Sequence, residues 1–362
     1  MRRPERIVDV DVHHCYEQSE DLVPYLPDEH VDKFLGDDGV SIGGRQFGNN
    51  GGFQGIMGEL RDESDNDPMM VTAGALIDDV RDRLLDEYDI DIALLTGFGT
   101  FLSASSYPDR EYGTALCRAF NEYTIENWLE VDDRFRYSLM VNHSDPDRAA
   151  EEVRRIGDHP QVIGVMMAPS ATYPFGNAVY DPIYQAAIDH DLTITCHLGG
   201  GGGIHSYPPT GAGHPTHYIE SRMSRHPNIQ AHLASLVFEG TFERFPEFRF
   251  VSLEWGWSWI PSFLWRMDHK WEQNKETFPD LGQAPSEYIR DHVRFNTQPV
   301  EEPETNEQLR QLLELMDGDE LLLYASDFPH WDFDNPDRTL TTVSPEVRRR
   351  IFADNASEVF AL

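Results

Sequence analysis

The sequence predicts an α/β protein built as a single (β/α)8 barrel over residues 1–362. Two observations predict this fold. Short apolar strand-like stretches alternate with helical stretches along the chain, which is typical of a parallel sheet. Eight such stretches occur, and several end in His, Asp or Glu, as expected where barrel strands reach the active-site face. A doubly wound open sheet is the alternative, but no GxGxxG turn follows the first strand.

The first predicted strand, Ile7–His13, has the sequence IVDVDVH and alternates strictly. Its three valines fall on one face, whereas Asp9, Asp11 and His13 fall on the other. Strand positions that face water usually carry Thr, Lys or Ser rather than two carboxylates and an imidazole. We therefore expect this polar face to point into the barrel, with its last two members available as ligands.

The segment after the first strand, residues 27–72, is rich in Gly, Asp and Asn and shows no periodicity. These residues predict a loop. The segment is too long for a simple connection, so we interpret it as an insertion that folds over the barrel mouth, where loops set specificity.

The seven remaining strands alternate with helical segments whose apolar residues recur at helical spacing. One of these helical segments, DPDRAAEEVRRIG, begins with an Asp that is suited to cap a helix. The strands are predicted at Ile90–Thr96, Phe135–Val141, Ile163–Ala168, Leu192–His197, Phe248–Glu254, Val293–Thr297 and Leu321–Ser326.

The residues best suited to catalysis or metal binding lie at the strand ends. His197 ends the fifth strand, Glu254 ends the sixth, and Asp327 directly follows the eighth. In a barrel these ends converge above the core, close to Asp11 and His13. Two imidazoles and two carboxylates together suit a divalent metal of the zinc or manganese type. Any one of them alone is more often a hydrogen-bonded loop residue, but chance rarely places the whole set on separate strands.

These residues also resemble a known family. D-x-H on the first strand, His197 within CHLGG, and SDFPH at Ser326–His330 are similar to the amidohydrolase-related proteins. That branch of the amidohydrolase superfamily includes aminocarboxymuconate-semialdehyde decarboxylase and γ-resorcylate decarboxylase. The resemblance runs nearly end to end and implies a barrel with one catalytic divalent metal, held by Asp11, His13, His197 and Asp327. We expect zinc, with manganese as the alternative.

Two positions depart from the family pattern. Many relatives carry His at the position of Asp11, and the sixth strand usually offers His where this chain has Glu254. Asp327 or Glu254 would serve as the base, and His330 would orient Asp327 or touch the substrate. The three carboxylates outnumber the charge of a dication, so the site should prefer a cationic substrate to a carboxylate. This count favours hydrolysis.

Three functions follow from these residues. The main hypothesis is a metal-dependent hydrolase that activates water at a mononuclear centre and cleaves a C–N or C–O bond of a small organic substrate. The alternative is a metal-dependent, non-oxidative decarboxylase of an aromatic or dienoic acid. The third is a non-catalytic acidic barrel, against which the intact ligand set argues.

Three further residues are candidates for substrate binding. Gln298 follows the seventh strand, Trp257 lies in an aromatic-rich stretch, and His205 lies in a Gly- and Pro-rich loop after the fifth strand. Each has a simpler interpretation as well. Gln298 can end its strand, Trp257 can belong to the core or a subunit interface, and His205 can be an ordinary loop residue.

The charge of the chain is unusual. Asp and Glu number 64 against 29 Lys and Arg, a net charge of −35, and lysine occurs only at positions 33, 270 and 275. This charge argues against nucleic-acid and anionic-membrane partners. The acids are dispersed, which fits adaptation to molar salt, where the Debye length falls to about 3 Å. We interpret the charge as the signature of an extreme halophile.

Localisation and assembly are predicted from composition. The three cysteines show no CxxC spacing, no apolar run approaches the roughly 18 residues of a membrane helix, and the N-terminus lacks a signal-peptide pattern. We therefore expect a cytoplasmic enzyme with a small-molecule substrate. A homodimer is one possible assembly, because dimers are the commonest oligomers.

Overall fold

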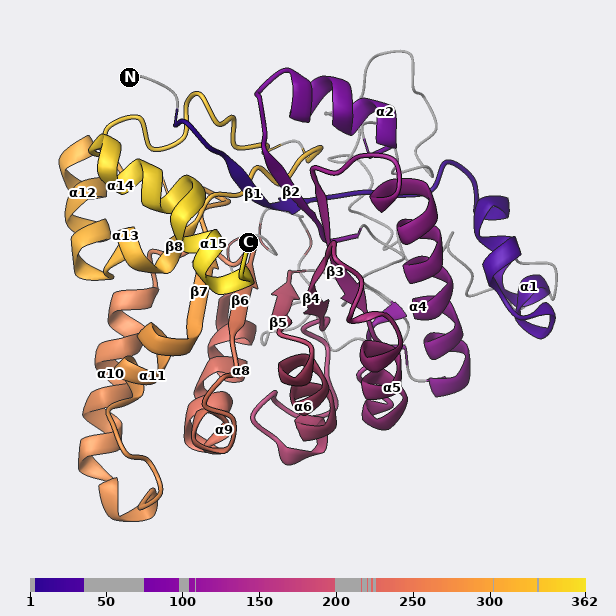
Figure 1. Ribbon diagram of the computed structural model, residues 1–362. Helices are drawn as coiled ribbons and strands as arrows, with labels where there is room; N and C mark the ends of the chain where they lie inside the picture. Colours follow the sequence, from indigo (N-terminus) through magenta and orange to yellow (C-terminus); the bar gives the residue numbers. More distant parts are fainter. Residues whose placement is uncertain are drawn as a thin grey trace.

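The eight predicted strands form one parallel sheet in the order of the sequence. The computed structural model describes residues 4–35, 75–97, 104–107, 109–198, 216, 220, 223, 226–301, 303–330 and 332–362. The strands are β1 (Val8–Val12), β2 (Ile92–Leu95), β3 (Phe135–Met140), β4 (Val162–Met166), β5 (Thr193–His197), β6 (Phe250–Leu253), β7 (Val293–Asn296) and β8 (Leu322–Leu323). Figure 1 shows them gathered at the centre of the molecule.

The barrel closes between β1 and the segment that follows β8. The His13 N–H donates to the carbonyl of Phe328 at 2.9 Å, and the Asp327 N–H donates to the carbonyl of Asp11 at 3.1 Å. Val12 and Phe328 form a parallel bridge. This pairing joins the first strand to the last, so the fold is a (β/α)8 barrel, as predicted, and the open-sheet alternative is wrong.

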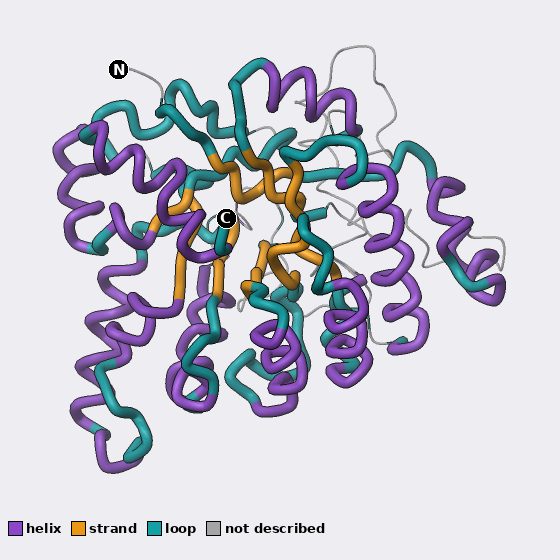
Figure 2. Tube along the Cα trace, in the orientation of Figure 1, coloured by secondary structure: helices purple, strands orange, loops and turns teal. Residues whose placement is uncertain are grey.

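Helices surround the strands on the outside of the barrel (Figure 2). No helix within the described residues is long and apolar enough to cross a membrane. The α-helices are α1 (Asp28–Leu35), α2 (Ile77–Val80), α4 (Arg110–Thr124), α5 (Pro146–Ile156), α6 (Asp181–Asp189), α8 (His226–Phe238), α9 (Thr241–Arg244), α10 (Ile260–Gln273), α11 (Pro285–His292), α12 (Asn306–Leu315), α13 (Gly318–Leu321), α14 (Pro345–Arg349) and α15 (Asn355–Phe360). Short 3₁₀ or π segments are η1 (Ser19–Tyr25), η2 (Arg81–Asp86), η3 (Ile125–Leu129), η4 (Ala178–Tyr180), η5 (Lys275–Thr277) and η6 (Arg350–Asp354).

The predicted and observed boundaries differ mainly at strand ends. The sequence predicts a strand over Leu321–Ser326, but β8 is limited to two residues. Beyond β8 the chain bonds irregularly to β1, and Asp327 adopts a left-handed conformation with φ 59°. Residues 28–35 of the predicted loop 27–72 form helix α1. Residues 36–72 lie outside the described residues.

The side chains of β1 alternate between the barrel interior and the layer between strands and helices. Its three valines are at most 1% exposed, and Asp9 and Asp11 are fully buried on the other face. The Asp9 carboxylate accepts the N–H of Ser326 at 2.9 Å and the N–H of Asp11 at 3.2 Å. Asp9 thus ties together the two segments that carry the functional carboxylates.

His232, on α8, is a buried histidine that is not part of the strand-end cluster. Its Nε2–H donates to the carbonyl of Pro169 at 2.9 Å, and its Nδ1 accepts the N–H of Phe175 at 3.2 Å. The ring stacks on Phe175 with centroids 3.8 Å apart. One nitrogen donates and the other accepts, so the folded protein holds this imidazole neutral. Burial lowers its pKa to about 4.

We expect this histidine to destabilise the protein in mild acid. The unfolded chain binds the proton near pH 6.5, whereas the folded protein binds it only near pH 4. The contribution of His232 to stability is therefore complete above pH 6.5 and declines by about 3 kcal/mol as the pH falls to 4. In urea unfolding at constant KCl, the free energy of unfolding should decline less steeply with falling pH for His232→Gln than for wild type. Equal declines would contradict the prediction.

Candidate metal centre and active site

Five titratable side chains gather at the carboxyl ends of four strands. Asp11 lies on β1, His13 directly follows β1, His197 ends β5, Glu254 follows β6, and Asp327 lies beyond β8. All five are at most 5% exposed. The structure therefore brings together the predicted ligands and the predicted base, because closure of the barrel converges these strand ends.

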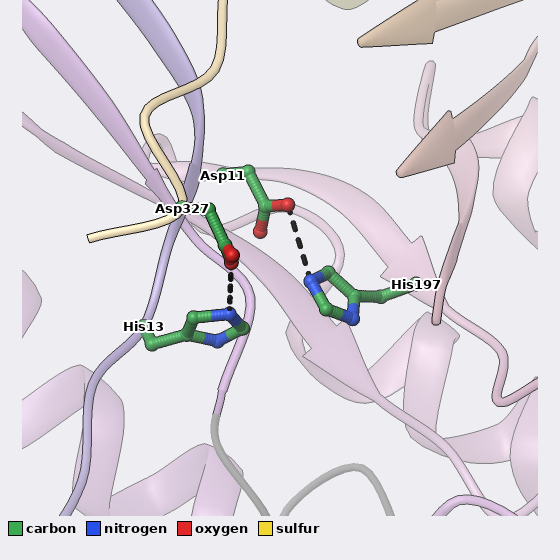
Figure 3. Close-up of side chains that lie close together, drawn as sticks. All are labelled: Asp11, His13, His197 and Asp327. Atoms are coloured by element: carbon green, nitrogen blue, oxygen red, sulfur yellow. Dashed lines mark hydrogen bonds and ion pairs between the residues drawn. The ribbon is translucent and has the colours of Figure 1, made fainter. Parts of the chain in front are cut away.

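Four of these side chains form a compact cluster, shown in Figure 3. The candidate ligand atoms of Asp11, His13, His197 and Asp327 all lie within 4.8 Å of one another. The His13 Nε2 is 2.8 Å from Asp327 Oδ1, and the His197 Nε2 is 3.1 Å from Asp11 Oδ2. Two imidazole nitrogens and two carboxylates at one point form a donor set that suits zinc or manganese.

Backbone carbonyls fix which nitrogen each imidazole offers. His13 donates its Nδ1–H to the carbonyl of Gly97 at 2.5 Å, and His197 donates its Nδ1–H to the carbonyl of Leu198. Each Nε2 therefore faces the cluster. The Nε2 of His197 is buried and is not aligned for a hydrogen bond with any described residue, although Asp11 lies close. A buried nitrogen left in this way fits a metal ligand.

The charges of the cluster are strongly coupled. Burial disfavours charge on His197, but the carboxylate of Asp11 outweighs it and raises the pKa of His197 to about 9. The pKa of His13 is also raised, because its hydrogen bond to Asp327 overcomes burial. Burial would raise the pKa of Asp327, but His330 and His13 hold it well below its usual range. The raised pKa values of the two imidazoles reflect the negative charge of the carboxylates, which a divalent cation would balance.

Two uncharged residues hold the carboxylate of Asp11. The Thr96 hydroxyl donates to Asp11 Oδ1 at 2.8 Å, and the Asn296 amide donates to Asp11 Oδ2 at 3.4 Å. The Asn296 carbonyl also accepts the N–H of Glu254 at 2.9 Å. Neither residue was predicted from the sequence. Their positions at the ends of β2 and β7 could have indicated a role in the site. A Thr or Asn at such a position is, however, also typical of an ordinary strand terminus.

Glu254 and His330 lie beside the cluster. Glu254 Oε2 is 4.0 Å from the His197 Nε2. His330 Nδ1 is 2.9 Å from Asp327 Oδ2, and its ring lies 4.4 Å from that of His13 between centroids. Glu254 and Asp327 both adopt positive φ, at 64° and 59°. Residues other than Gly rarely adopt a positive φ. Such strained residues cluster at functional sites.

The predicted substrate-binding residues lie in different surroundings. Trp257 is fully buried and donates its Nε1–H to the carbonyl of Thr297 at 3.1 Å, as a core residue would. Gln298 is also buried and donates to the carbonyl of Asp332 at 3.2 Å. His205 lies outside the described residues. A substrate role for these three residues stays a prediction.

The fold and this cluster define the class of the protein. A closed (β/α)8 barrel with convergent His and carboxylate side chains at the carboxyl ends of its strands is the architecture of a barrel enzyme. The profile of the protein family described as Amidohydrolase matches residues 10–362. The chain belongs to this family, as the sequence motifs indicated. It is therefore an enzyme, and the hypothesis of a non-catalytic barrel is wrong.

Similar proteins identify the branch of the family. The chain is 27% identical over 302 residues to γ-resorcylate decarboxylase of Rhodococcus jostii strain RHA1, covering 79% of this chain and 88% of that protein. The structure of 5-carboxyvanillate decarboxylase LigW from Sphingomonas paucimobilis matches with a TM-score of 0.68 at 19% identity, covering 99% of both chains. Dihydroxybenzoic acid decarboxylase from Polaromonas sp. JS666, with bound manganese and 2-nitroresorcinol, matches with a TM-score of 0.65 at 17% identity, covering 99% of this chain and 97% of that one.

These likenesses revise the expected reaction. At such identities the two solved structures show the shared fold alone. The sequence relative and the family support the decarboxylase branch of the amidohydrolase superfamily. They favour the carboxy-lyase alternative over the hydrolase that charge counting led us to expect.

We expect the cluster to bind one divalent ion per chain. Protein purified in molar KCl without chelator should contain close to one zinc or manganese ion, and His197→Ala should lose it, because a buried ligand is removed. His232→Gln is the matched control and should keep the ion. Elemental analysis makes the measurement. Equal metal content in wild type and His197→Ala would contradict the assignment.

Proposed function

We propose that the enzyme is a divalent-metal-dependent carboxy-lyase that removes the carboxylate of a hydroxylated aromatic acid as CO₂. The observation that carries the proposal is the match to γ-resorcylate decarboxylase over 88% of that protein. The buried cluster of two histidines and two aspartates supports it. The Polaromonas decarboxylase holds manganese, which makes manganese our preferred ion, with zinc as the alternative.

In this proposal Asp11, His13, His197 and Asp327 hold the ion. When bound, its positive charge would bind and polarise the oxygen atoms of the substrate. The two oxygens of Asp327 have separate partners. Oδ1 faces His13 within the cluster, whereas Oδ2 accepts a hydrogen bond from His330 Nδ1 at 2.9 Å. Oδ2 is therefore the atom that is placed to take up a proton from His330 along this hydrogen bond.

The reaction exchanges a carbon–carbon bond for a carbon–hydrogen bond. The Oδ2 of Asp327 takes the Nδ1 proton of His330 and delivers it to the ring carbon that bears the carboxylate. The bond to the carboxylate then breaks, its electron pair returns to the ring, and CO₂ leaves. His330, whose side chain is 17% exposed, replaces the proton from solvent. Glu254 takes the proton of the ring hydroxyl, which increases the electron density at the carbon being protonated, and returns it to the product.

The substrate class can be tested directly. Enzyme loaded with Mn²⁺ in molar KCl should release CO₂ from one or more benzoates with a hydroxyl group beside the carboxylate, such as 2,6-dihydroxybenzoate or 5-carboxyvanillate. Unsubstituted benzoate is the matched control and should release none, because it lacks the hydroxyl that activates the ring. Carboxyl-labelled substrate and mass detection of CO₂ make the measurement. Hydrolysis of esters, amides or lactones without any CO₂ release would instead establish the hydrolase.

Asp327→Asn separates proton transfer from metal binding. The amide cannot deliver a carboxyl proton, so kcat should fall by about 10²–10⁴-fold. The exposed carboxylate of Asp337 offers a control, and Asp337→Asn should keep wild-type turnover. Metal content must be measured on every variant. An Asp327→Asn enzyme that kept both its ion and full turnover would end the assignment of this residue.

A further inference from the structure

One residue just beyond β2, Gly97, lies between the two consecutive histidines that follow β1. The Gly97 carbonyl accepts the Nδ1–H of His13 at 2.5 Å. The N–H of the same residue donates to the Nδ1 of His14 at 3.2 Å. Gly97 has φ 79°, a left-handed conformation that glycine adopts without strain. The orientation of a proposed ligand, His13, is thus linked to a neighbouring histidine that is not a ligand.

The hydrogen bonds fix the tautomer of His14. A backbone N–H can only donate, so the Nδ1 of His14 must offer a lone pair and its proton must lie on Nε2. That Nε2–H donates to the hydroxyl of Thr124, the last residue of α4, at 2.9 Å. The ring is fully buried and makes edge contacts with Trp128 and Tyr137 at centroid distances of 5.1 and 5.7 Å. Packing and hydrogen bonding therefore hold this imidazole in one orientation.

We propose that His14 is a positioning residue for the metal centre, which it serves by fixing the backbone conformation of Gly97 so that the Gly97 carbonyl orients His13. The proposal rests on the metal centre of the proposed function. Without the acceptor at His14 Nδ1, the φ and ψ angles of Gly97 are free to change, so the Gly97 carbonyl moves and the Nδ1–H of His13 loses its partner. The Nε2 of His13 is then no longer fixed as the atom that faces the ion, and the affinity for the ion falls.

Two substitutions at this position separate hydrogen bonding from packing. In His14→Asn the amide oxygen can take the place of Nδ1 and accept the Gly97 N–H. In His14→Gln the longer amide reaches the place of Nε2 and Thr124, but it does not offer the acceptor beside Gly97. Both variants remove an aromatic ring, so they share any loss that is due to packing alone.

The dissociation constant for Mn²⁺ is the readout, measured in molar KCl on wild type and both variants. We expect His14→Gln to weaken Mn²⁺ binding by about 10–100-fold and to change the electron paramagnetic resonance spectrum of the bound ion. We expect His14→Asn to bind within about threefold of wild type. Equal constants for the two variants, whether weakened together or both unchanged, would overturn the role of His14. A wild type that binds no Mn²⁺ would overturn the proposed function instead.

A second measurement needs no variant and no metal. Nitrogen-15 NMR of wild-type protein with labelled histidine reports which nitrogen of His14 carries the proton. We expect the Nε2–H tautomer at neutral pH. Protonation at Nδ1 would exclude the hydrogen bond from Gly97 and overturn the proposal, even if the variants failed to fold.

Discussion

The backbone pairing that closes the barrel is the constraint on which the site depends. The N–H of Asp327 donates to the carbonyl of Asp11, and the N–H of His13 donates to the carbonyl of Phe328. These bonds join residues that are more than 300 positions apart in the chain. These backbone bonds alone fix how far apart the residues lie that carry two carboxylates and one imidazole of the site. An open sheet with the same strands would leave Asp327 at the opposite edge from Asp11.

A layer of neutral donors and acceptors surrounds the cluster and fixes its side chains. Thr96 and Asn296 hold the carboxylate of Asp11, and Gly97 orients His13. All three residues lie at the ends of β2 and β7, strands that contribute none of the four proposed ligands. Two strands without proposed ligands therefore take part in the site as well.

The sequence predicted the parts of the site that follow from local geometry. Alternation along β1 placed Asp11 and His13 on one face, because successive strand side chains must point to opposite sides. It could not reveal Asn296, whose bond to Asp11 spans 285 positions and leaves no local pattern. Trp257 illustrates a second limit. A tryptophan after a strand has the same appearance in sequence whether it lines a pocket or donates to a buried carbonyl, as it does here.

The charge of the site explains why the sequence favoured hydrolysis, the reaction that the similar proteins support less well. Counting Asp11, Asp327 and Glu254 against a dication gives a negative centre, which would disfavour a carboxylate substrate. The structure shows that these groups are not bare charges. Both oxygens of Asp11 accept hydrogen bonds from neutral donors, and both oxygens of Asp327 contact imidazole nitrogens. Donors directed at a carboxylate offset its field within the barrel. The formal count therefore overstates the negative charge that a substrate carboxylate would meet, which reconciles the residues of this site with the decarboxylases that the chain resembles.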